Sequence, residues 1–248
     1  MLISAGIIAL FAIMFLGGHN DLNLSAIEKY VKKEVVDETR KNEIKVELKK
    51  VKELQKSYNK QTKANEKKLS QLISTYQATE EDFNKLFDEL VAYENEVGEK
   101  FIPIRIKVQN LITTEEWDRI LVSMQKDLKK DRKTQEKEFK KFKSKLEKGK
   151  TRILDHVDIG NYETAEKLLE DFNQSMIAFV EEILNMDPEE QKKRMIKIDG
   201  EVEFKSLIQD DIEEWLGLLQ AVSDVNIELK TMVPEESWKS VSKEINKF

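Results

Sequence analysis

Apolar residues between positions 44 and 97 recur at alternating spacings of four and three residues. The apolar residues of this pattern are Ile44, Leu48, Val51, Tyr58, Leu69, Leu72, Tyr76, Phe83, Leu86, Leu90, Tyr93 and Val97, and polar Gln55, Thr62, Asn65 and Thr79 occupy its remaining positions. Such a heptad pattern places an apolar stripe along one side of a helix, and that stripe must be buried against another helix. The pattern therefore predicts long helices packed as in a coiled coil. If unbroken, a helix over this stretch would be about 80 Å long.

A helix start signal interrupts this stretch at Thr79. A threonine at this place caps free backbone amides, and the acidic residues that follow it, Glu80 to Asp82, suit the positive end of the helix dipole. The long helix therefore kinks or restarts here. Because the apolar pattern continues beyond Thr79, we expect both parts to share a packing partner.

The next boundary lies around Gly98 and Pro103. From Ile102 to Val108 apolar residues fall at every second position, as in a short strand. An isolated strand has no partner with which to pair. We therefore expect residues 99–112 to form an extended connector or the first turn of a helix.

The rest of the chain is predicted to form several further helices. Thr113 and Glu116 have the spacing of a capping box at a helix start. Gly160, Gly200 and Pro234 end or interrupt the helices that follow. The predicted fold is all-α, an elongated antiparallel helical bundle of about four to six helices with coiled-coil-like long helices.

The pattern divides the chain into four regions. These are an apolar terminus (1–18), a long heptad helix region (22–98), a connector (99–112) and a helical bundle region (113–248). The apolar run MLISAGIIALFAIMFL would span about 24 Å as a helix, less than the roughly 30 Å of a membrane's hydrocarbon core. It fits either a signal peptide or a short membrane anchor. A buried terminal helix is a weaker interpretation, because the run has no polar face.

The charged residues that follow this terminus support two opposite orientations in the membrane. Lys29, Lys32 and Lys33 follow it, and by the positive-inside rule they favour a cytoplasmic domain. A short apolar core followed by small residues, with Asp21 as the first charge, is instead typical of a secretion signal. We expect a membrane-associated protein with an extracytoplasmic domain, and the cytoplasmic side is the alternative.

Charge is strongly segregated in the second half of the chain. Residues 126–152 contain thirteen Lys and Arg but five Asp and Glu, whereas residues 155–191 contain eleven acids and Lys167 as the single base. One interpretation is a basic helix that contacts an anionic partner. Its candidate contacts are Lys129, Lys133, Lys137, Lys140, Lys141 and Lys145. The favoured interpretation is that the basic and acidic helices pack side by side.

Composition limits the chemistry that the chain can perform. It has no cysteine, which excludes thiolate nucleophiles and zinc–thiolate sites, and it lacks a Gly-x-Ser-x-Gly elbow and a phosphate-binding glycine loop. Its two histidines, His19 and His156, supply no Glu-x-x-His pair for a di-iron bundle. The net charge of −6 and the spacing of the aromatics in the basic run argue against nucleic acid. We expect no enzyme activity, cofactor or metal.

Three functional hypotheses follow. The first is a non-enzymatic, membrane-tethered helical scaffold or accessory protein with a protein partner or self-association. The second is an extracytoplasmic binding module, chaperone-like or sensor-like, for a client protein or anionic ligand, which a large exposed apolar patch would favour. The third, an enzyme or metal protein, would need stoichiometric bound metal. Trp238, in the tail after Pro234, either docks onto the bundle or anchors a partner.

Overall fold

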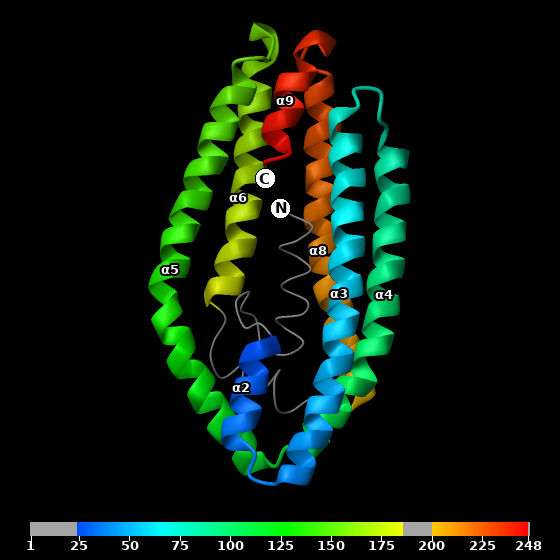
Figure 1. The fold of residues 1–248 in the computed structure, drawn as a ribbon. Coiled ribbons are helices and arrows are strands. Elements are labelled where there is room, and N and C mark those ends of the chain that lie inside the picture. Colours follow the sequence, from blue (N-terminus) through cyan, green and yellow to red (C-terminus); the bar gives the residue numbers. More distant parts are fainter. Residues whose placement is uncertain (1–23, 186–199, 248) are drawn as a thin grey trace.

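The structure is a computed structural model that describes residues 24–185 and 200–247, and each element within these ranges is helical (Figure 1). The α-helices are α2 (Leu24–Glu34), α3 (Glu38–Ser74), α4 (Glu80–Leu111), α5 (Thr114–Leu154), α6 (Tyr162–Asn185), α8 (Glu201–Lys230) and α9 (Trp238–Ile245), with short 3₁₀ helices η1 (Ile159–Asn161) and η2 (Glu235–Ser237). The predicted all-α class is confirmed. The apolar terminus, residues 1–18, lies outside the described residues.

The strongest heptad stretch forms a hairpin of two helices. Thr79 caps α4: its side chain accepts a hydrogen bond from the Asp82 amide at 3.3 Å, and the Asp82 carboxylate accepts one from the Thr79 amide at 2.9 Å. The predicted restart at Thr79 is confirmed. Because α3 and α4 pack antiparallel, the two parts bury their apolar stripes against each other as well as against other helices. An unbroken helix of about 80 Å is therefore not formed.

The predicted connector over residues 99–112 is wrong. Helix α4 continues through Gly98 and Pro103 to Leu111. Its buried residues in this part, Phe101, Ile102, Arg105 and Val108, have helical spacing. Proline removes one backbone donor and disfavours a helix interior. Here the helix is retained because its buried side packs against neighbouring helices, α3 and α8 among them.

The contacts between the five long helices run in the order α3, α4, α8, α6, α5. Neighbours in this order are antiparallel (Figure 1). Two short helices connect the ends of this row. Helix α2 packs against both α3 and α5 near one end of the molecule, and α9 packs against the same two helices near the other. The first and last described helices therefore lie on one face, between α3 and α5.

Helices α6 and α8 in the second half of the chain each bury one apolar side. Helix α8 follows Gly200, whose φ of 157° few other residues adopt, and the tail helix follows Pro234 as predicted. The buried apolar residues of α6 and α8 are Ala165, Leu169, Phe172, Met176, Ile208, Ile212, Trp215, Leu219, Val222, Val225 and Leu229. This spacing places one side of each helix in the core and leaves the charged side at the surface.

Candidate functional site

The basic helix α5 and the acidic helix α6 pack side by side, as the favoured interpretation of their charges predicts. Lys143 forms an ion pair with Glu181 at 2.7 Å, and Lys150 forms one with Glu170. These lysines and glutamates lie on the facing sides of the two helices. Part of the charge segregation is thus used within the chain, where each exposed pair contributes about 0–1 kcal/mol.

Many lysines of α5 point elsewhere. Lys137, Lys140, Lys141 and Lys145 are exposed, and of these Lys141 pairs with Glu138 on its own helix at 2.6 Å. The side chains of Lys129 and Lys133 lie outside the described part of the structure. The candidate contacts that can be placed are therefore available at the surface, and packing against α6 does not consume them.

A second basic helix, α3, was missed by the sequence reasoning. It has eleven Lys and Arg against five Asp and Glu. Lys49, Lys56 and Lys63 are exposed and follow one another at intervals of seven residues, which places them on one side of the helix. That spacing is the signal that could have revealed this surface from the sequence.

Trp238 docks onto the protein itself. It is 2% exposed, its indole Nε1 donates a hydrogen bond to the Ile73 carbonyl oxygen at 3.1 Å, and its ring meets that of Tyr76 edge to face. The Lys230 amine lies over the same indole and donates to the Ala78 carbonyl oxygen; burial lowers its pKa to about 8. A partner could reach Trp238 only by displacing α9, so the docked alternative describes this residue.

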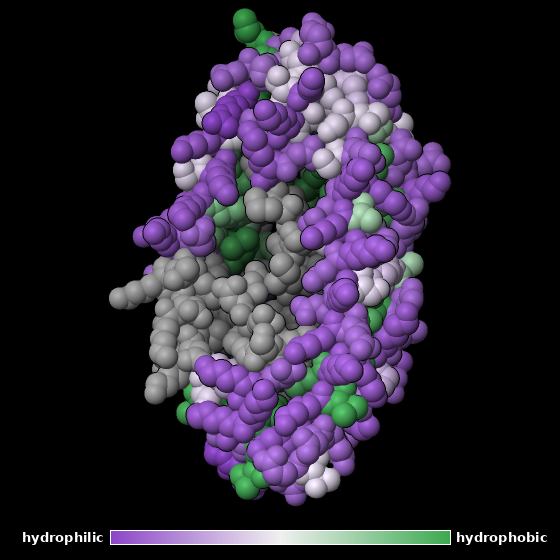
Figure 2. Space-filling model, viewed as in Figure 1, coloured by the Kyte–Doolittle hydropathy of each residue, from purple (hydrophilic) through white to green (hydrophobic). Residues whose placement is uncertain are grey.

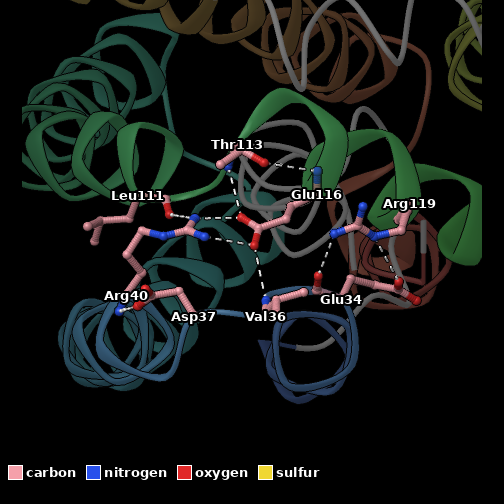
Figure 3. A network of polar contacts seen from close by, with 8 residues as sticks. All are labelled: Glu34, Val36, Asp37, Arg40, Leu111, Thr113, Glu116 and Arg119. Atoms are coloured by element: carbon pink, nitrogen blue, oxygen red, sulfur yellow. Dashed lines mark hydrogen bonds and ion pairs between the residues drawn. The ribbon is translucent and has the colours of Figure 1, made fainter.

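A polar network joins two helix connections at the end of the molecule near α2 (Figure 3). The Glu116 carboxylate accepts two hydrogen bonds from the Arg40 guanidinium, at 2.6 and 2.9 Å, and one each from the amides of Val36 and Thr113, both at 3.0 Å. Hydrogen bonding to Arg40 is the main cause that lowers the pKa of Glu116 to about 2. Beside it, Arg119 of α5 donates to the Glu34 carbonyl oxygen at 3.0 Å. The network fixes how α2 and α3 meet α5.

A second buried carboxyl group lies between α3 and α4. The Tyr58 hydroxyl is 3.0 and 3.1 Å from the two carboxylate oxygens of Glu94, and Tyr58 stacks on Tyr93. Burial raises the pKa of Glu94 to about 7, against the opposing effect of the Tyr58 hydrogen bond. Because Glu94 is 2% exposed, this group is suited to affect stability more than to act on a substrate.

The described residues contain neither a metal cluster nor a membrane-spanning helix. Within residues 24–185 and 200–247, no three metal-ligating side chains come together as a candidate metal site. Among the helices of those ranges, none combines the length and apolar character needed to cross a membrane. Comparison of the chain with known protein families, with characterised proteins and with solved structures finds no match.

Proposed function

We propose that this protein is a non-enzymatic, membrane-tethered helical scaffold or accessory interaction protein. The observation that carries the proposal is the burial of the apolar stripes between helices of the same chain. Among the described residues, the large apolar side chains left exposed are Val36, Val46, Val122 and Val202, each on its own segment, and the neighbours Ile159 and Tyr162 around the start of α6. Single exposed apolar residues are ordinary, whereas a client-binding module needs a contiguous patch.

The surface that this packing leaves is mostly charged. On the face shown in Figure 2, hydrophilic residues cover most of the coloured surface. Long helices with charged outer sides suit a protein that holds partners at a distance or joins them, by contacts with a protein partner or with a second copy of the chain. Helix α3, at 37 residues, is about 55 Å long.

The apolar terminus supplies the tether in this proposal, and the helical domain lies outside the cytoplasm. An epitope placed after Phe248 tests the topology. In cells prepared so that the outer face of the plasma membrane is accessible, we expect added protease to digest the epitope while a cytoplasmic control protein survives. Protection of the epitope until lysis would contradict the extracytoplasmic placement.

Deletion of residues 2–18 tests the tether separately. The full chain should sediment with membranes and remain there in high salt, whereas the deleted chain should move to the soluble fraction. A full chain that is released without detergent would contradict the tether. Metal analysis of the purified full chain addresses the non-enzymatic part, because stoichiometric metal would revive the enzyme hypothesis.

A further inference from the structure

The charges of this protein are divided between two sides of the fold. Helices α3 and α5 have eleven and fourteen basic residues against five and eight acidic ones. Helices α4, α6 and α8, which lie between them in the row, together have twenty-two acidic and seven basic residues. The net charge of −6 hides this division. We define the basic face as the surface of α3 and α5 on the side where α2 and α9 pack.

Contacts with α2 and α9 show which residues of α3 belong to the basic face. Lys52 forms an ion pair with Glu28 of α2 at 2.7 Å, and Ser74 accepts a hydrogen bond from Asn246, just after α9, at 3.1 Å. Lys56 follows Lys52 by four residues, Lys63 follows Lys56 by seven, and both are exposed. They therefore lie on the same side of α3, between the two short helices.

The same argument places lysines of α5 on this face. Arg119 contacts Glu34 of α2, and Arg152 forms an ion pair with Glu244 of α9 at 3.1 Å. Lys148 and Lys145 precede Arg152 by four and seven residues, and both are exposed. Among the described contacts, Lys56, Lys63, Lys145 and Lys148 form no ion pair, so their charge is available to a partner.

The short helices add to the positive charge. Their acidic residues are Glu28, Glu34 and Glu244, and each is paired with a base. Their exposed lysines include Lys32 and Lys239. The face thus combines basic residues from four helices, and the acids of its two short helices are paired with bases.

We infer that the basic face docks onto the phosphate groups of an anionic lipid bilayer. The basic residues of α3 and α5, which α2 and α9 connect across this face, form a broad charged surface, and such a surface fits a flat bilayer. The apolar terminus also leads directly into α2, which lies on this face. A membrane-inserted terminus would therefore hold the basic face next to the lipid head groups; to this extent the inference rests on the proposed tether.

A soluble polyanion fits less well. Phe139 and Phe142, the aromatic residues within the basic run, are partly buried and stack on each other with ring centres 6.4 Å apart. Single-stranded nucleic acid prefers exposed aromatic rings on which bases can stack. A lysine close to an anionic membrane surface strengthens binding about fivefold, and a flat lipid surface engages several at once.

The test uses the full chain, whose lack of cysteine allows a single label. Asn59→Cys puts a fluorophore among the α3 lysines of the basic face, and Gly217→Cys puts one on exposed α8, where a side chain meets nothing within 4 Å. Both proteins are reconstituted into vesicles of phosphatidylcholine alone or with about one-third phosphatidylglycerol. Energy transfer to head-group-labelled lipid then reports the distance of each site from the bilayer.

We expect strong transfer from position 59 only in the anionic vesicles, and weak transfer from position 217 in both. Raising the salt to about 1 M, where the screening length falls to about 3 Å, should abolish the difference. Equal transfer from the two positions, or transfer from position 59 that is independent of lipid charge, would overturn the inference.

Two variants, each with four lysines replaced, test whether docking depends on where the lysines lie or only on the total charge of the protein. The first variant changes Lys56, Lys63, Lys145 and Lys148 to Gln. On anionic vesicles it should lower the ratio of docked to undocked protein more than about 100-fold. The matched control changes Lys85, Lys100, Lys167 and Lys205 to Gln, four exposed lysines of α4, α6 and α8, and should leave the ratio within about twofold. Equal losses in both variants would contradict a specific face.

The same vesicles distinguish this inference from the tether. A chain that floats with neutral vesicles but never docks on anionic ones retains the tether and overturns the basic-face inference. A chain that does not bind neutral vesicles but docks on anionic ones in a salt-dependent way retains the basic-face inference and overturns the tether. Polyphosphate or single-stranded DNA is then added to the protein docked on anionic vesicles. If either one displaces the protein at a lower concentration of negative charge than the lipid needs for docking, the ligand is a soluble polyanion and the lipid assignment is overturned.

Discussion

The carboxylate of Glu116 and the guanidinium of Arg40 form a two-point ion pair between the start of α5 and the first turn of α3, with N–O distances of 2.6 and 2.9 Å. The same carboxylate completes the capping box of α5 by accepting from the Thr113 amide. One side chain therefore both starts α5 and joins it to the first turn of α3, which lies 76 positions earlier in the sequence. Charge-assisted, two-point hydrogen bonds of this kind are among the stronger ones in proteins.

Removing this carboxylate is expected to destabilise the protein. Glu116→Gln leaves the Arg40 guanidinium without its anion and should cost about 2–3 kcal/mol in the free energy of unfolding, measured by urea denaturation at pH 7. Glu115→Gln is the matched control, because Glu115 is exposed, and should change stability by less than about 0.5 kcal/mol. Equal effects of the two changes would show that the ion pair contributes little.

The same pair predicts a loss of stability in acid. The pKa of Glu116 in the folded protein, about 2, is lower than its ordinary value of 4.5, so the unfolded chain binds its proton first. Stability from this group is fully present above about pH 4.5 and is lost as the pH falls towards 2. The free energy of unfolding of Glu116→Gln should therefore approach that of the parent protein below pH 3. A constant difference from pH 7 to pH 2.5 would contradict this.

Glu94 predicts a pH effect of the opposite sign. Burial raises its pKa from 4.5 to about 7, so the folded protein holds this proton after the unfolded chain has released it. Stability from this group should fall as the pH rises from about 4.5 to about 7 and then stay constant. Glu94→Gln removes the ionisable group, so relative to the parent it should gain about 2–3 kcal/mol between pH 4.5 and pH 8.

The control for Glu94 is a carboxyl group on the surface of the same helix. Glu96→Gln alters an exposed residue of α4 and should track the parent protein at both pH values. Denaturant titrations at pH 4.5 and pH 8 measure all three proteins. If the difference in the free energy of unfolding between Glu94→Gln and the parent is the same at pH 4.5 and pH 8, the buried carboxyl group does not titrate in this range.

Trp238 tests how tightly α9 is attached to the hairpin of α3 and α4. Trp238→Ala removes a buried indole and should cost about 3–5 kcal/mol in the free energy of unfolding. Trp238→Phe keeps an aromatic ring but loses the hydrogen bond to Ile73 and should cost about 1–2 kcal/mol. Circular dichroism during urea titration measures both. A cost below about 1 kcal/mol for the alanine change would show that α9 does not dock in solution.

Exchanging the charges of Lys150 and Glu170 tests the pairing of α5 with α6. Lys150→Glu should destabilise the protein by about 1–2 kcal/mol, because it places a new carboxylate next to Glu170 and Glu147. Adding Glu170→Lys should recover about 0.5–1 kcal/mol. A double variant that is no more stable than Lys150→Glu alone would show that the two side chains do not interact.

The sequence predicts those features that local chemistry decides. The starts of α4 and α5 follow from Thr79 and Thr113, because a capping box needs only four consecutive residues. The course of α4 through Pro103 is not predicted. A proline signals a break locally, whereas the buried residues on both sides of it keep the segment helical through contacts with other helices.

The candidate site is likewise predictable in part. The pairing of α5 with α6 follows from the opposite charges of consecutive segments. The contribution of α3 to the basic face depends on which helices become neighbours, and its lysines are diluted among polar residues in the sequence. The contact of Arg40 with Glu116 joins residues 76 positions apart, and no local pattern reveals that the ends of two hairpins meet.

The attachment of α9 has a consequence for the order in which the protein can mature during synthesis. The carbonyl oxygen of Ile73 receives hydrogen bonds from Asn226 and Trp238, which are 153 and 165 positions later in the chain. The whole α3–α4 hairpin therefore emerges from the ribosome long before Asn226 and Trp238, which cover its tip, have been synthesised. Until residue 238 has emerged, the apolar side chains beneath Trp238 are accessible to chaperones and proteases. The burial of this part of the first hairpin is thus completed only when the last helix has been synthesised.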